Sequence, residues 1–90
     1  MYSLHLTKRF TKDSKKLNDK DLKHVKEVLE RLANNETLES KYKDHALSGE
    51  LNGIRDCHIK PDLILLYKKD NEILELLALR VGSHSDLFKK

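Results

Sequence analysis

A run of five apolar residues, Leu63 to Tyr67, constrains the fold more than any other segment of the chain. Pro61, which has no backbone N–H to offer a sheet, precedes the run, and polar residues at 69–72 follow it as a hairpin turn. A short segment that is apolar at every position is typical of a strand buried inside a sheet. The rest of the chain must therefore supply neighbouring strands and a layer that covers them.

Three further segments have the composition of strands. Residues 2–7 alternate between apolar and polar side chains, which predicts a half-buried first strand. Residues 51–59 form a second candidate, entered through two glycines, and residues 73–81 are apolar except at Glu75 and Arg80. Residues 36–49 have no clear period and are expected to form a loop. Residues 83–88 are expected to form a short helical or irregular tail after Gly82.

The segment between the first two strands has the period of a helix. A first helix starts at Lys8 and places Phe10, Ser14 and Leu17 on one side. After an interruption, Asp19 or Asp21 is expected to cap a second helix, which ends at Asn34-Asn35. Its apolar residues recur at helical spacing: Leu22, Val25, Val28, Leu29 and Leu32. The predicted order is β-α-α-β-β-β, an α+β fold with two N-terminal helices on a mostly antiparallel four-stranded sheet.

Length and composition predict a single domain over residues 1–90. No segment has the roughly 20 consecutive apolar residues of a membrane span, and the first residues lack the pattern of a signal peptide. The single cysteine, Cys57, cannot form an internal disulfide and fits a reducing compartment. We therefore expect a cytoplasmic protein without a membrane partner.

Positive charge is concentrated near the N-terminus. Between Lys8 and Lys26 there are nine basic side chains, counting His24, against three aspartates. A surface of this kind attracts polyanions such as RNA. The alternative is that these side chains only form the solvent-exposed faces of the two helices and bind no partner.

Histidines, acids and an arginine that suit catalysis lie in four short segments of the second half of the chain. Asp56 and His58 are two residues apart in a predicted strand and so share one face of the sheet. His45 enters from the loop, Asp62 follows the turn, and Arg80 ends the last strand beside His84 and Phe88. These groups suit metal-free cleavage of a phosphodiester, because histidine exchanges protons near neutral pH and arginine binds phosphate. An isolated Asp-x-His pair is more often a surface pair, and no tight ligand spacing supports a zinc site.

The same residues carry a resemblance to a known family. The chain reads Lys-Asp-His-Ala-Leu-Ser-Gly at 43–49, Arg-Asp-Cys-His-Ile-Lys-Pro-Asp at 55–62 and Arg-Val-Gly-Ser-His-Ser-Asp-Leu-Phe at 80–88. In this order they resemble the YafQ-type branch of the RelE/ParE toxin superfamily. The resemblance implies a microbial-RNase-like α+β fold and a ribosome-dependent mRNA endoribonuclease, the toxin of a type II toxin–antitoxin pair. It implies attack by the 2′-hydroxyl without metal or cofactor, and a cognate antitoxin, mRNA and the ribosome as partners.

Roles follow from the resemblance residue by residue. His84 is expected to be the general acid, and His45 or His58 with Asp62 the base. Asp56 would be a supporting acid, Arg80 the phosphate ligand and Phe88 the aromatic that contacts a base. The expected contacts with ribosomal RNA are Lys8, Lys12, Lys15, Lys16 and Lys20.

One departure from the family pattern concerns Leu63, which stands where the family has a tryptophan after Pro-Asp. Two other functions stay open at this point. The first is a ParE-like toxin that binds DNA gyrase, and the set of three histidines argues against it. The second is a non-catalytic basic module that binds RNA or an antitoxin.

Overall fold

The apolar run Leu63–Tyr67 lies in the central strand of a sheet in the computed structural model, which describes residues 1–88. The strands are β1 (Ser3–Leu6), β2 (His45–Ala46), β3 (Arg55–Lys60), β4 (Leu63–Asp70) and β5 (Glu75–Gly82), in the spatial order β1-β5-β4-β3-β2. β1 runs parallel to β5, and the other three pairs are antiparallel. The prediction of an α+β fold with a mostly antiparallel sheet is therefore confirmed.

The count of elements differs from the prediction. Residues 1–88 form five strands and three α-helices rather than four and two. The additional strand, β2, has only two residues, which is too short to show an alternating pattern. The additional helix, α3 (His84–Phe88), lies in the expected tail. The prediction that the first strand is half-buried was wrong. All four residues of β1 are exposed, because β1 is an edge strand.

The two N-terminal helices begin at side-chain caps. The Thr7 hydroxyl accepts a hydrogen bond from the Phe10 N–H at the start of α1 (Lys8–Ser14). Asn18, rather than either predicted aspartate, caps α2 (Asp19–Ala33) by accepting from the Asp21 N–H. Asn34 follows the last helical residue, as predicted. A single 3-10 turn, η1 (Ser40–Tyr42), interrupts the expected loop. A second, η2 (Gly49–Leu51), reaches the predicted start of the next strand, and β3 begins only at Arg55.

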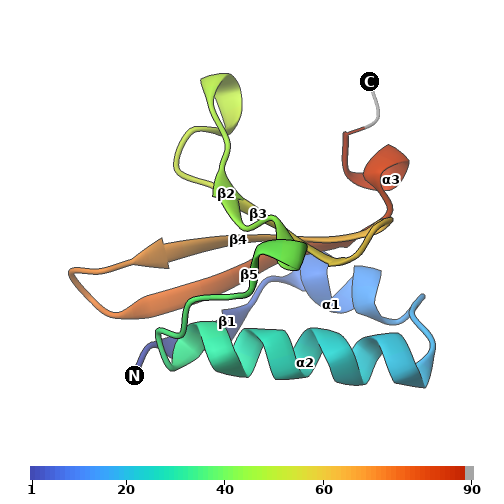
Figure 1. Cartoon of the computed structure of the whole chain (residues 1–90), viewed down its shortest axis with the longest axis horizontal. Coiled ribbons are helices and arrows are strands. Elements are labelled where there is room, and N and C mark those ends of the chain that lie inside the picture. The colour runs from blue at the N-terminus through green and yellow to red at the C-terminus, as the bar shows by residue number, and fades with distance from the viewer. Residues whose placement is uncertain (89–90) are drawn as a thin grey trace.

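The hydrophobic core lies between the sheet and the helices α1 and α2. These helices cover one face of the sheet, and α3 and the loop around β2 stand on the other side (Figure 1). Alternate strand residues point into the core, among them Cys57, Leu65 and Tyr67. Their neighbours Asp56, His58, Ile64 and Leu66 consequently point to the side away from the helices. We call this side the open face.

An apolar groove marks the helical side of the molecule. It lies between β1, α1 and α2 and has a volume of about 880 Å³.

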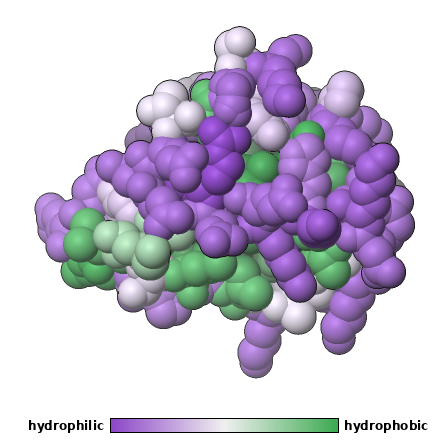
Figure 2. All heavy atoms as spheres, turned by 60° about the horizontal axis from the view of Figure 1, so that its bottom comes forward, coloured by the Kyte–Doolittle hydropathy of each residue, from purple (hydrophilic) through white to green (hydrophobic). Residues whose placement is uncertain are grey.

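The residues of this groove include exposed leucines of the edge strand. Leu4 is 42% and Leu6 is 53% exposed, and Phe10 and Leu29 line the floor. Figure 2, which views the molecule with the helical side brought forward, shows apolar atoms gathered in a band between charged side chains. No helix within residues 1–88 is long and apolar enough to cross a membrane.

Candidate active site on the open face of the sheet

Strand register aligns three of the predicted site residues in one row. His45 pairs with Asp56, Asp56 with Leu66, and Leu66 with Arg80, so the row crosses β2, β3, β4 and β5. At about 4.8 Å between neighbouring strands, the backbone positions of His45 and Arg80 are roughly 14 Å apart. The next row contains His58, paired with Ile64, which pairs with Gly82 just before α3. The register thus places His45, Asp56 and Arg80 in one row of the sheet and His58 in the adjoining row.

Asp56 and His58 form a close pair on this face. The Nε2 of His58 lies 3.4 Å from Oδ1 of Asp56. Asp56 is only 5% exposed, and Oδ1 has no hydrogen-bond partner within residues 1–88. A carboxylate at this distance from an imidazole nitrogen restricts the orientation of the ring. This pair was predicted from the spacing of the two residues.

His45 is exposed and held by its own loop. Its Nδ1 lies 2.6 Å from the Lys43 carbonyl oxygen, so Nδ1 carries the proton and donates it. The Nε2 of the neutral ring is then left as an acceptor facing away from that bond. Lys43 adopts a left-handed backbone conformation with φ 48°, which is uncommon for a residue with a side chain. The turn at Lys43 therefore sets the tautomer of His45.

The loop before β2 is fastened to the sheet through Asp44. The Tyr67 hydroxyl donates to Asp44 at 2.5 Å, and the Arg55 Nε donates to the same oxygen at 3.2 Å. Burial, together with this bond to Asp44, raises the pKa of Tyr67. Tyr67 is buried as predicted, but its hydroxyl also anchors the loop that carries His45.

Asp62 holds the start of α3. Its Oδ1 accepts a hydrogen bond of 3.2 Å from the His84 backbone N–H. The rings of His84 and Phe88 lie against each other with centroids 4.9 Å apart. Asp62 thus contacts the backbone of His84. Within residues 1–88 it makes no hydrogen bond to the ring of His45 or of His58.

Arg80 is paired with an acid that the sequence did not single out. Asp13 of α1 accepts from Nε and Nη2 of Arg80, both at 3.0 Å. These bonds raise the pKa of Arg80. A visible signal was present in the sequence: Asp13 follows Phe10 by three residues and so adjoins the apolar side of a helix, where a charge needs a partner.

The predicted RNA-binding lysines are all exposed. Lys8 and Lys12 lie in α1, Lys20 lies in α2, and Lys15 and Lys16 lie in the connection between them. A further basic region borders His58: a cavity of about 340 Å³ that is lined in part by Lys41, Lys43, Lys60 and His24. His24 is half-buried, and its Nε2 lies 3.2 Å from the Tyr42 hydroxyl oxygen.

Side chains of the metal-ligating types and the single cysteine can be located in the described part of the chain. No group of three or more His, Cys, Asp or Glu side chains within residues 1–88 is arranged to hold a metal ion. Cys57 is fully buried, and burial raises the pKa of its thiol, so it is a core residue rather than a nucleophile.

A family model and a relative of known name both identify the same toxin family. Residues 2–89 match the family described as the bacterial toxin of type II toxin–antitoxin systems, YafQ. The chain is 39% identical over 83 residues to the mRNA interferase toxin YafQ of Escherichia coli K12, covering 89% of this chain and 88% of that protein.

Two known structures have the same fold. A metal-bound toxin from Helicobacter pylori is 40% identical, with a TM-score of 0.86, over 98% of this chain and 100% of that one. YafQ in the E. coli DinJ–YafQ complex is 33% identical, with a TM-score of 0.83, over 98% of this chain and 99% of that one. The chain is thus a toxin of the type II toxin–antitoxin class. Within that class it belongs to the YafQ family.

Proposed function

We propose that this chain is an mRNA interferase that cleaves mRNA on the ribosome. The observation that carries the proposal is the row of His45, Asp56 and Arg80 across the open face, with His58 in the next row and His84 at the end of β5. Proton-transfer groups and a phosphate ligand therefore share one surface. The name of the E. coli relative, mRNA interferase toxin, supports the same activity.

The proposed reaction uses the RNA's own 2′-hydroxyl as nucleophile. His45, whose Nε2 is free to accept, removes the proton as the 2′-oxygen attacks phosphorus. The bond from phosphorus to the 5′-oxygen breaks, and His84 protonates that oxygen. The products are a 2′,3′-cyclic phosphate and a 5′-hydroxyl. Arg80 and the His58–Asp56 pair stabilise the charge on phosphorus, and Phe88 contacts a base.

Binding to the ribosome is assigned to the basic N-terminal surface. Lys8, Lys12, Lys15, Lys16 and Lys20 are exposed and would contact phosphates of ribosomal RNA. The lysine-lined cavity beside His58 adds positive charge close to the reacting groups.

A cognate antitoxin is the proposed partner that controls the activity. The E. coli relative forms a complex with DinJ. In this chain the apolar groove between β1, α1 and α2 suits an amphipathic segment of an antitoxin, whose acidic side would face the neighbouring lysines.

Primer extension on mRNA in translating ribosomes tests the function. The wild-type chain should produce new 5′ ends, and His84→Ala should not. A message with a 2′-deoxy nucleotide at the cut site should resist the wild type, because it lacks the nucleophile. Absence of cleavage by the wild type would reject the interferase and favour gyrase binding or a non-catalytic role.

A further inference from the structure

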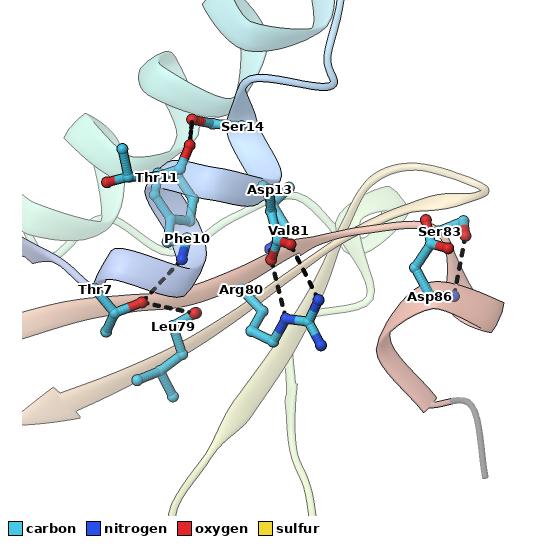
Figure 3. Close-up of polar contacts among 10 residues, drawn as sticks. All are labelled: Thr7, Phe10, Thr11, Asp13, Ser14, Leu79, Arg80, Val81, Ser83 and Asp86. Atoms are coloured by element: carbon cyan, nitrogen blue, oxygen red, sulfur yellow. Dashed lines mark hydrogen bonds and ion pairs between the residues drawn. The ribbon is translucent and has the colours of Figure 1, made fainter.

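Asp13 receives three hydrogen bonds from the end of β5. Besides the two from Arg80, the Val81 N–H donates to Oδ2 at 3.2 Å. Figure 3 shows the carboxylate of Asp13 and the guanidinium of Arg80 pointing toward each other. Asp13 is buried, with 8% of its surface exposed, although it belongs to a helix rich in exposed lysines.

The contact exists because α1 takes the place of β1 along the edge of β5. β1 ends at Leu6, opposite Ala78. Beyond that point the Thr7 hydroxyl donates to the Leu79 carbonyl at 2.8 Å, and Asp13 accepts from Val81 (Figure 3). The register between β4 and β5 shifts in the same region, next to Leu66. The side chain of Arg80 thus projects from β5 beside a register shift, and contacts from α1 stabilise this part of the strand.

The geometry of the pair leaves part of the guanidinium available. Arginine has five N–H donors, and Asp13 uses one on Nε and one on Nη2. The two on Nη1 and the second on Nη2 have no hydrogen-bond partner within residues 1–88. These remaining donors form the outer edge of the fork, which matches two oxygens of a phosphate.

We propose that Asp13 is a positioning residue that holds Arg80 with this outer edge toward the scissile phosphate. The proposal rests on the interferase function given above. An arginine held on one side loses less freedom when it binds phosphate, and its donors are already oriented when charge develops on phosphorus.

Asp13→Asn separates this role from a purely structural one. The amide keeps an oxygen that can accept from Val81 but removes the charge that holds the guanidinium. The rate constant kcat for cleavage on programmed ribosomes should fall about 10-fold to 100-fold while KM changes little, as expected for a misplaced transition-state group. Glu36→Gln is the matched control: Glu36 pairs with Arg31 at 3.0 Å, and its loss should leave kcat unchanged.

A double-mutant cycle tests whether Asp13 acts through Arg80. In an Arg80→Lys background, which lacks the fork, Asp13→Asn should lower kcat much less than it does in the wild type. An equal loss of kcat in both backgrounds would overturn the proposal, as would a kcat for Asp13→Asn equal to that of the wild type.

A measurement without cleavage keeps this test apart from that of the function. By NMR, the Arg80 Nε–H of the wild type should exchange slowly with solvent and shift when an RNA oligonucleotide methylated at every 2′-oxygen is added. In Asp13→Asn it should exchange faster and respond less. Identical exchange and response in the two proteins would overturn the positioning role even if the wild type cleaves no RNA.

Discussion

The Nε2 of His58 lies 3.4 Å from an Asp56 oxygen that is buried without a hydrogen-bond partner among residues 1–88. A carboxylate oxygen that is buried without a hydrogen bond lowers the free energy of unfolding. Such a cost is common where a residue serves function rather than stability.

Asp56→Asn should therefore lower activity without lowering stability. The amide cannot stabilise a protonated His58, and we expect cleavage to fall about 100-fold, within the usual range for acid–base groups. The free energy of unfolding should stay the same or rise by about 1 kcal/mol, because a buried charge is removed. Urea denaturation and primer extension measure the two effects. A variant that is less stable but fully active would contradict this account.

His84→Ala should abolish cleavage and leave the fold intact. His84 is exposed at the start of α3, and its ring contacts Phe88 rather than the core. Loss of the proton donor is expected to cost about 100-fold or more in kcat. His5→Ala is the control, because His5 is exposed on β1 and pairs only with Glu75. Comparable activity of the two variants would remove His84 from the mechanism.

Tyr67→Phe should loosen the loop that carries His45. The substitution removes the hydroxyl that donates to Asp44 but keeps the buried ring. Loss of a hydrogen bond to a charged group should cost about 1.5–3 kcal/mol of unfolding free energy. Hydrogen exchange should speed up around residues 43–46, and cleavage should fall less than in His84→Ala. Unchanged exchange in this loop would show that Asp44 does not anchor it through Tyr67.

The elements with strong periodicity could be predicted from the sequence. β4 and α2 depend on local patterns, an uninterrupted apolar run and a helical repeat, and both were predicted within a few residues. β2 could not be, since two residues carry no pattern and pair only because β3 is present. The exposure of β1 depends on its place at the edge of the sheet, which local alternation does not reveal.

In the candidate site, too, local contacts could be predicted from the sequence and long-range contacts could not. The Asp56–His58 pair follows from strand geometry alone, so the spacing was sufficient to predict it. Asp13 and Arg80 are 67 residues apart, and their contact requires β1 to end before β5 does. No local pattern contains that information. The roles of His45, His84 and Arg80 in cleavage stay predictions until they are measured.

Ribosome binding should weaken as salt rises if the lysines of the N-terminal surface contact RNA. Each phosphate contact that is lost should reduce the slope of log affinity against log salt by about one unit. Lys12→Gln should show this reduction, whereas Lys68→Gln, an exposed lysine of β4, should not. Sedimentation with ribosomes at several salt concentrations gives the slopes. A slope for Lys12→Gln equal to that of the wild type would exclude this lysine from the interface.

The contribution of Asp13 to stability should depend on pH. Burial acts against ionisation, but the hydrogen bonds from Arg80 and Val81 and the charges of Arg80 and Arg9 together lower the pKa of Asp13. A carboxyl whose pKa is lower in the folded than in the unfolded state stabilises the fold above the unfolded value of about 3.9, and this stability is lost as pH falls through the folded pKa. Wild type and Asp13→Asn should therefore differ by a nearly constant unfolding free energy between about pH 7 and 5, and the difference should shrink below about pH 4. Urea denaturation across this range measures it, and a difference that grows on acidification would contradict the assignment of Asp13 as the ionised partner of Arg80.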